Sequence, residues 1–407
     1  MKVASRGPSA PEPRAVGNAP RILGGLCVAA GAAALGAGLA GDHPERAWQA
    51  LLVNFLLFSS IAQGGVLLAA VASTVRARWA APVSGLAQAF AGFFPFSFVC
   101  FFALALGGKF VFPWLEEDLH GKEVWLNLPF LLARDGLGFL LLYGVGGAFI
   151  VQDLKLRLGA GEGGGALRRW LCRRLPQRPG EIERVRRRRR LWGGLYCAAY
   201  ALVLSLVGFD LVMSLDPHWY STLFGGYHFV KAFYLGLGGV IVLAVLIRER
   251  AKREVPASCL HDLGKLFFAF CLLWADFFYV HLMVIWYGNI PEEASYVILR
   301  TVTPPWNALA WAVFLSAFAV PFLVLINRRV KSMPRPMLAL CILVLAGLWL
   351  EHLLLVGPAL HPEAAELPLG VLDGLVFTGF LGLMVLAVTA MLRVFPELLP
   401  GIRPAGA

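Results

Sequence analysis

Long apolar runs separated by short polar segments make up most of the chain. Each run has about 20 or more residues, enough for a helix to cross a hydrocarbon core about 30 Å thick. The runs lie near residues 22–40, 47–73, 83–107, 127–151, 191–214, 220–247, 262–287, 304–326, 336–357 and 370–392. This pattern predicts an all-α integral membrane protein with about ten transmembrane helices.

The first run differs from the others because it consists mostly of Ala and Gly and follows a Pro-containing tail. Small residues also follow it, so it is either a transmembrane helix or a cleaved signal peptide. With the first interpretation, the predicted organisation is a cytoplasmic tail (1–21), helices one to four (22–152), a basic cytoplasmic loop (153–190), helices five to ten (191–393) and a cytoplasmic tail (394–407).

Lysine and arginine are concentrated in alternate polar segments, and this asymmetry predicts the orientation. The segments on the other side hold only Arg46, Lys109, Lys122 and Arg300. Since basic loops stay on the cytoplasmic side, both termini are predicted to be cytoplasmic. The opposite loops carry several glutamates together with Trp and Tyr, so the outer face is expected to be acidic.

Composition supports a membrane protein and excludes several other classes. The chain of 407 residues is 58% hydrophobic and only 15% charged, too little polar surface for an ordinary soluble domain. Its net charge of +11 follows from the topogenic segments, so no nucleic-acid partner is expected. In the loop 153–190, a Gly-rich stretch precedes five consecutive arginines at 186–190. No Lys-Ser/Thr follows the glycines, which favours a flexible linker with lipid-facing arginines over a phosphate loop.

The cysteines and histidines give no support for a redox centre in this chain. None of the seven cysteines forms a CxxC or CxxCH motif, which argues against covalent haem, zinc or iron–sulfur ligation. We expect these cysteines to be small buried hydrophobic residues. Bis-histidine haem b is a remaining hypothesis, but no helix carries two histidines about 14 residues apart. No metal site is predicted.

Several ionisable residues fall inside the predicted spans, where a charge is costly and therefore a candidate for function. At about 1.5 Å per residue from the outer helix ends, most lie at roughly 6–12 Å depth, and the two deepest at about 16–18 Å. The deepest are Lys231 and Asp276. The others are Arg134, Asp135, Asp210, His228, His281, Glu351, His352 and, nearer the surface, Asp373.

Lys231 and Asp276 have equal predicted depth on consecutive antiparallel helices, so we expect them to form an ion pair or share a water chain. Helical spacing places His228 with Lys231, and Asp276 with Tyr279, on faces expected to point into one bundle interior. His281 lies about 140° around the helix from Asp276 and is expected on a different surface. The alternative is that these groups are static contacts between helices.

The predicted inner half of the membrane is poorer in such groups. Lys265, near its edge, is the only comparable ionisable residue, so a complete proton channel is not expected unless water and hydroxyls such as Ser59 or Ser205 complete it. Two other classes stay open: a secondary transporter with Lys231 and Asp276 as its coupling pair, and a structural scaffold. Transporters commonly break helices at the substrate site, and the sixth and seventh spans show no paired interruption.

Three motifs near the predicted outer ends carry a resemblance to a known family. They are residues 210–227 (DLVMSLDPHWYSTLFGGY), residues 285–293 (IWYGNIPEE) and residues 124–130 (VWLNLPF) with Arg134. Together with the ten spans and the length, they closely resemble the F subunits of bacterial alternative complex III. That complex is a quinol:cytochrome c oxidoreductase, and these subunits belong to the NrfD-like, polysulfide-reductase group of membrane subunits.

The resemblance implies two four-helix bundles, from spans two to five and six to nine, flanked by spans one and ten. It implies a bacterial cytoplasmic membrane and partnership with a similar quinol-binding membrane subunit, an iron–sulfur subunit and haem c subunits. It also implies that this chain is not the redox-active one. Two roles follow, an auxiliary site for a quinone such as menaquinone or a proton pathway. The positions within or beside the motifs are Arg134, Asp210, Asp216, His218, Tyr227, Trp286, Tyr287, Glu292 and Glu293.

Overall fold

The structure is a computed structural model that describes residues 18–119, 121–158, 165–361 and 364–401. In these ranges every regular element is a helix, and ten helical segments are long and apolar enough to cross a membrane. The predicted all-α membrane fold with ten spans is therefore confirmed. Residues 1–17 and 402–407 of the predicted tails and the Gly-rich stretch at 159–164 lie outside the described residues.

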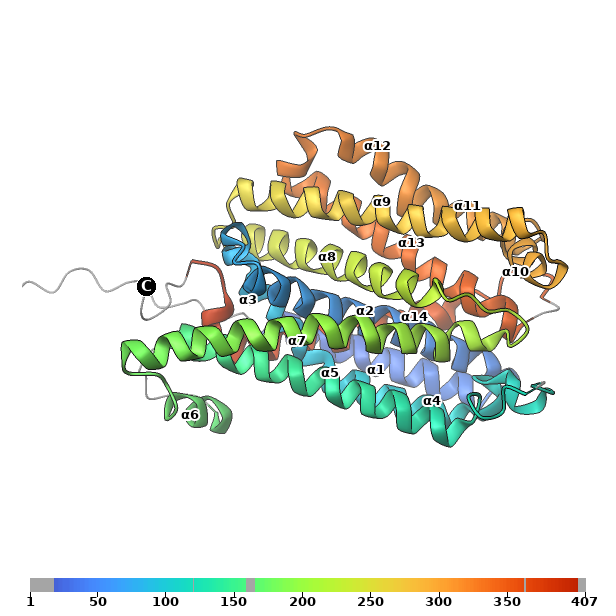
Figure 1. The fold of residues 1–407 in the computed structure, drawn as a ribbon, viewed down its shortest axis with the longest axis horizontal. Coiled ribbons are helices and arrows are strands. Elements are labelled where there is room, and N and C mark those ends of the chain that lie inside the picture. Colours follow the sequence, from blue (N-terminus) through green and yellow to red (C-terminus); the bar gives the residue numbers. More distant parts are fainter. Residues whose placement is uncertain (1–17, 120, 159–164, 362–363, 402–407) are drawn as a thin grey trace, which may run out of the picture.

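The ten spans run back and forth along the long axis of the molecule (Figure 1). In order they are α1 (Ala19–Leu39), α2 (Pro44–Thr74), a composite third span (Arg78–Phe110) containing α3 (Ala81–Ala89) and α4 (Phe94–Leu104), α5 (Leu128–Arg157), α7 (Pro179–Leu211), α8 (Phe224–Arg250), α9 (Ala257–Gly288), an eighth span (Trp306–Ile326) containing α11 (Trp306–Phe314) and α12 (Val320–Ile326), α13 (Pro334–Leu360) and α14 (Val371–Val394). Two short helices, α6 (Ala166–Cys172) and α10 (Pro291–Thr301), lie between spans.

The spans form two four-helix bundles, as the resemblance implies. The first bundle consists of α2, α4, α5 and α7, and the second of α8, α9, the eighth span and α13. Helices α1 and α14 pack along each other and flank α2. The bundle ends are named after the predicted orientation: the outer end carries the 212–223 loop and α10, and the inner end carries α6.

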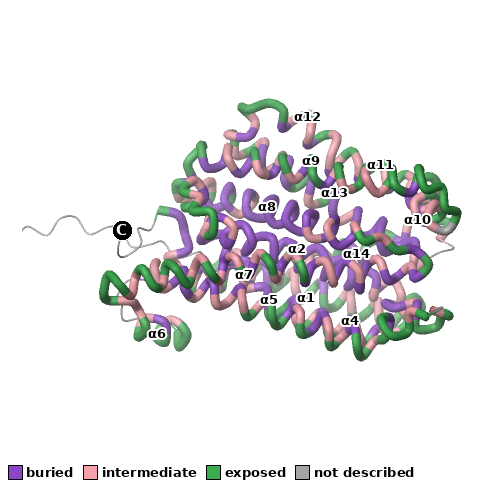
Figure 2. The backbone as a smooth tube through the Cα atoms, in the orientation of Figure 1, coloured by how far each residue is buried: buried purple, intermediate pink, exposed green. Residues whose placement is uncertain are grey.

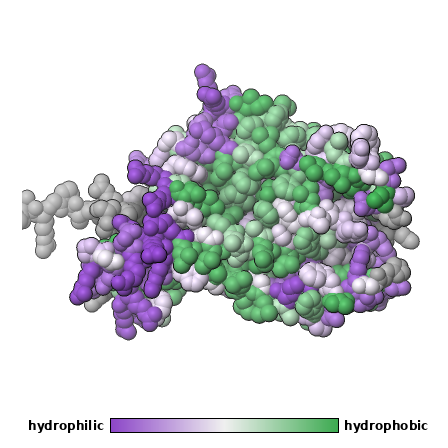
Figure 3. Space-filling model, in the orientation of Figure 1, coloured by the Kyte–Doolittle hydropathy of each residue, from purple (hydrophilic) through white to green (hydrophobic). Residues whose placement is uncertain are grey.

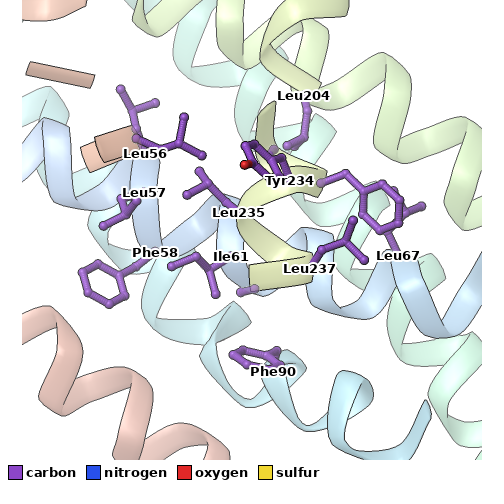
Figure 4. Packing of buried hydrophobic residues seen from close by; sticks show 14 of the residues in the cluster. Leu56, Leu57, Phe58, Ile61, Leu67, Phe90, Leu204, Tyr234, Leu235 and Leu237 are labelled. Atoms are coloured by element: carbon purple, nitrogen blue, oxygen red, sulfur yellow. The ribbon is translucent and has the colours of Figure 1, made fainter. Parts of the chain in front are cut away.

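The two bundles meet where α2 packs against α8, the two most buried helices at the centre of the molecule (Figure 2). Glycines allow this approach, because a Cβ added to Gly64 would lie 2.4 Å from the carbonyl oxygen of Ala232. Small residues at such crossings let helix backbones come close in a membrane. Apolar side chains such as Ile61 and Leu235 fill the space around the crossing (Figure 4).

At the inner end, helices continue beyond the apolar runs. Helix α5 ends at Arg157 and α7 begins at Pro179, so the five arginines at 186–190 belong to a helix. The predicted loop 153–190 therefore includes the ends of two helices, because arginine and glutamate are good helix formers and an apolar span can extend into water as a polar helix. The Gly-rich stretch, predicted as the flexible linker, lies outside the described residues. Figure 3 shows an apolar band across the middle of this face and hydrophilic residues at the end near α6.

Candidate functional site

A buried carboxylate, Glu351 on α13, lies at the centre of a polar cluster inside the second bundle. Its Oε1 accepts hydrogen bonds from the Tyr227 hydroxyl and from Lys231 Nζ, the latter at 3.5 Å. Its Oε2 accepts one from the Trp274 indole at 3.3 Å. Lys231 and Glu351 are 0% and 2% exposed, so both charges are withdrawn from solvent and lipid. Three donors from two neighbouring helices thus converge on one carboxylate.

The predicted pair between Lys231 and Asp276 is wrong. Lys231 points into the bundle toward Glu351, whereas Asp276 is exposed on the opposite side of α9. Tyr279, on the same face as Asp276, is 57% exposed and also points away from the interior. A charge at mid-membrane depth costs about 2.5–3.5 kcal/mol on insertion scales. Glu351 therefore offsets the charge of Lys231, and Asp276 lacks a comparable partner among the residues described.

Two buried histidines adjoin the Lys231–Glu351 pair. His228, one turn before Lys231 on α8, and His352, next to Glu351 on α13, are 1% and 0% exposed. The prediction that His228 and Lys231 share an inward face is confirmed. His352 Nδ1 lies 2.7 Å from the Leu348 carbonyl oxygen. Four ionisable side chains on two helices therefore share one interior.

A cavity of about 80 Å³ leads to this cluster from the outer end. It lies between α9 and α11, and α10 contacts both of these helices and α13. Its walls are mainly aromatic and aliphatic, and its polar lining includes Glu351, Tyr227 and His281. Phe278 and Leu282 line the cavity and are also exposed on α9, so the cavity adjoins the membrane-facing surface.

His281 is held in one orientation at the wall of this cavity. Its Nδ1 lies 2.7 Å from the Phe277 carbonyl oxygen, which only accepts, so Nδ1 carries the proton and Nε2 is an acceptor. Within the described residues, Nε2 has no hydrogen-bond partner. The ring packs against Tyr227 with 5.7 Å between centroids. As predicted, His281 and Asp276 lie on different surfaces of α9, and it is His281 that faces the site.

Arg300 and Tyr296 on α10 form the outer wall of the cavity. The Tyr296 ring stacks on Trp219 at 3.8 Å between centroids, and the Arg300 guanidinium lies 3.4 Å from the Tyr296 ring centroid. Arg300 also donates hydrogen bonds to the carbonyl oxygens of Tyr296 and Leu355. Burial lowers the pKa of Arg300, while Tyr296 and Asp216 act in the opposite direction. The sequence predicts Arg300 only as a loop charge.

The motif at 210–227 connects both bundles. Its first residue, Asp210 on α7, binds Arg134 of α5, with Nε donating to Oδ2 at 2.8 Å, and the Trp125 indole donates to Oδ1 at 3.0 Å. Farther along, Asp216 lies 3.8 Å from Arg300, and Tyr227 donates to Glu351. The structure thus brings together the motif around Trp125, the motif at 210–227 and α10, the helix that begins at Pro291 within the motif at 285–293.

The Asp210 site is a second polar cluster, at the outer end of the first bundle. The Arg134 guanidinium lies 3.9 Å from the Trp125 ring centroid and 4.6 Å from that of Phe130, which fixes its plane. Asp135, the next residue after Arg134 on α5, is fully buried. The ion pair joins α5 directly to α7, so we interpret this cluster as a clamp between the two helices.

The remaining predicted site residues lie away from these clusters. Trp286 and Tyr287 are 71% and 88% exposed at the outer end of α9, where interfacial aromatic residues are expected. His218 lies in an outer loop, 3.8 Å from Glu117. Asp373 accepts a hydrogen bond from the Gly370 amide and caps α14. Glu293 is partly exposed on α10, and the Glu292 side chain lies outside what is described.

The first bundle contains a chain of neutral hydroxyl groups that the sequence did not reveal. The Tyr143 hydroxyl donates to Ser97 at 2.9 Å, and Ser97 donates to Ser59 at 2.8 Å. Nearby, the Tyr196 hydroxyl donates to the Gln63 side chain at 2.7 Å. Two serines were named as groups that could complete a proton path. Ser59 belongs to this row of hydroxyl groups, whereas the Ser205 hydroxyl donates to the carbonyl oxygen of Ala201 in its own helix.

The inner end does hold a buried carboxylate, contrary to the prediction from the sequence. Asp153, in the last turns of α5, is 2% exposed and accepts hydrogen bonds from Gln88, Arg157 and Arg189. Lys265 is exposed and pairs with Asp262 at 3.0 Å. Asp153 was missed because α5 extends into the segment assigned to a loop. Arg157 is on α5 itself, whereas Arg189 is on α7, so the bond from Arg189 ties α5 to α7.

The chain was compared with known proteins by two routes. No protein-family model matches it. A search of curated proteins also returns no match. The resemblance carried by the three motifs therefore stays a prediction, and the function is inferred from the geometry of the site.

The described residues favour an organic ligand over a metal ion. Among them, no group of three or more His, Cys, Asp and Glu side chains could hold a metal. Three of the seven cysteines are buried and four are partly exposed, and none forms a disulfide. The reduced ring of a quinol fits the cavity chemically, because aromatic walls suit its faces and Glu351 and His281 Nε2 are acceptors for its hydroxyl groups.

Proposed function

We propose that this chain is a membrane subunit of a bacterial quinol:cytochrome c oxidoreductase of the alternative complex III type. It would lie in the cytoplasmic membrane with both termini inside and carry no redox centre of its own. Its partners would be a similar quinol-binding membrane subunit, an iron–sulfur subunit and haem c subunits. The observation that carries the proposal is the aromatic cavity that ends on Glu351.

In this proposal the cavity holds a quinone close to a buried proton-binding group. His281 Nε2, which has no partner among the described residues, and Glu351 would accept hydrogen bonds from quinol hydroxyls, and both groups carry protons in acid–base chemistry. Lys231 pairs with Glu351, so the carboxylate is not an isolated ion in the membrane, and His228 and His352 lie beside this pair. Electrons would pass through partner subunits, while this chain would bind the ring and exchange protons with the outer side.

The structure argues against the alternative that this chain is a secondary transporter. It rested on Lys231 and Asp276 as a coupling pair, and these two side chains point in different directions. A purely structural scaffold would not require a cavity that ends on a buried ion pair. A quinone-binding and proton-exchanging subunit is therefore the function the geometry supports best.

Tryptophan fluorescence gives a direct test, since Trp219 and Trp274 line the cavity and quinones quench nearby indoles. A short-chain naphthoquinone would be titrated into the purified complex that carries wild-type chain, Ala310→Phe or Ala308→Phe. Ala310 lines the cavity, whereas Ala308 is exposed on the same helix. We expect Ala310→Phe to weaken quenching about tenfold, a loss of about 1.4 kcal/mol, and Ala308→Phe to leave it unchanged.

Two results would contradict the proposal at different levels. Equal quenching in all three proteins would contradict the proposed quinone site. Purification of the native chain without iron–sulfur or haem c subunits would contradict its proposed membership of a respiratory complex. For the proton role, Glu351→Gln is expected to slow quinol:cytochrome c turnover and proton release, and wild-type values for both would argue against it.

A further inference from the structure

One helix presents an ionisable residue to the outside of the molecule at mid-membrane depth. Asp276 lies 12 residues before the end of α9 at Gly288, which is about 18 Å from the outer end of the helix. Its side chain is exposed, and within the described ranges no hydrogen bond or ion pair involves its carboxylate. Hydrocarbon offers no partner to such a group, so lipid is an unfavourable neighbour.

Asp276 belongs to a continuous exposed stripe along α9, called here the α9 stripe. Its members recur every three or four residues and therefore lie on one helical face. They are Lys265, Ala269, Leu272, Asp276, Tyr279, Met283 and Tyr287. This spacing is that of a helix seam that packs against another helix. Figure 2 shows α9 near the edge of the molecule, with exposed and intermediate residues along its length.

We propose that the α9 stripe is a subunit interface within the membrane, occupied by a transmembrane helix of a different polypeptide. That helix carries a cation or a hydrogen-bond donor at the depth of Asp276. A buried partner on the other chain would satisfy the carboxylate just as Lys231 and Tyr227 satisfy Glu351 inside this chain. Tyr279, one turn away, adds a hydroxyl to the same polar centre.

Charge complementarity favours a different chain over a second copy. Copies inserted in the same orientation and related by a two-fold axis along the membrane normal meet at equal depth, so Asp276 would face Asp276. The one basic residue of the stripe, Lys265, lies 11 residues away, about 16 Å along the helix. It is also paired with Asp262 near the inner end. A second copy therefore supplies no donor at the required depth.

Photo-crosslinking in native membranes tests the occupant directly. A benzophenone amino acid would replace Leu272 or Met283 in the stripe, and Leu140 on α5 would serve as the exposed control. We expect an adduct with a different membrane polypeptide from the two stripe positions and not from Leu140. An adduct of two copies of this chain, or labelling of lipid alone at the stripe, would overturn the proposal.

A pull-down of Asp276 variants distinguishes a subunit interface from a lipid-facing surface, because the two predict different changes in recovery of the partner polypeptide. Asp276→Leu should reduce recovery of the partner polypeptide in a pull-down about tenfold, whereas Asp276→Asn, which keeps hydrogen-bonding capacity, should reduce it less than about threefold. If Asp276 faced lipid, Asp276→Leu would leave recovery unchanged or raise it, and that result would overturn the proposal. The crosslinks use wild-type Asp276, so a folding defect in Asp276→Leu does not affect them. Quinone quenching at the cavity is independent of either outcome.

Discussion

The two four-helix bundles bury different kinds of polar group near their centres. The first holds neutral hydroxyls, from Tyr143 through Ser97 to Ser59, whereas the second holds the ion pair of Lys231 and Glu351. Neutral hydroxyls that bond to one another can fix helices at a small desolvation cost. A buried ion pair often gives less stability than apolar packing would. The cavity also reaches the ion pair, so the second bundle is where we place function.

The largest expected effect comes from removing one charge in the second bundle. Lys231→Met leaves Glu351 in an apolar interior without its cation, and we expect a loss of about 3–5 kcal/mol in the free energy of unfolding. Denaturant titration of the purified chain in detergent, followed by tryptophan fluorescence, would measure it. Lys265→Met removes an exposed pair with Asp262 and should cost less than about 1 kcal/mol.

The double variant Lys231→Met with Glu351→Met sharpens this result. If the ion pair is kept for function, the double variant should regain most of the stability lost in Lys231→Met, because neither charge is then left alone. A double variant as unstable as the single one would mean that the pair stabilises the fold itself. The contrast between the two bundles would then fail.

A smaller effect is expected where the bundles meet. Gly64→Ala places a Cβ 2.4 Å from the Ala232 carbonyl oxygen, so α2 and α8 must move apart. Overpacking of this kind costs about 1–3 kcal/mol, measured by the same titration. Gly144→Ala on α5 is the control, because its added Cβ meets nothing within 4 Å. Equal stability of the two variants would show that α2 and α8 can move apart at their crossing without loss of stability.

Sequence patterns predicted which segments form the ten long apolar helices better than which way a side chain points around a helix. The ten spans, the two bundles and the burial of His228 and Lys231 could be predicted from apolar run lengths, helical spacing and the family resemblance. The partner of Lys231 could not, because lipid and protein interior are both apolar, so the lipid-facing and protein-facing sides of a membrane helix have similar residues. Asp276 was therefore placed on the wrong side of α9.

Contacts between segments far apart in the chain could not be predicted from the sequence either. Glu351 lies 120 residues from Lys231, and no local spacing relates the two. Trp274 and Tyr296 were missed because an aromatic residue in an apolar run gives no signal of its hydrogen-bond partner or stacking neighbour. Asp153 was missed for another reason, since the end of an apolar run is not the end of a helix.

The smallest effect is predicted for the hydroxyl chain of the first bundle. Tyr143→Phe removes the donor to Ser97, and we expect a loss of about 0.5–1.5 kcal/mol, typical of one hydrogen bond between membrane helices. Ser97 still donates to Ser59, so no charge is left without a partner and the loss stays small. Tyr287→Phe, at a tyrosine 88% exposed, should be neutral in the same titration. A loss for Tyr143→Phe as large as that for Lys231→Met would contradict the distinction between the bundles. It would mean that the hydroxyl chain, like the ion pair, supports a group whose burial is costly.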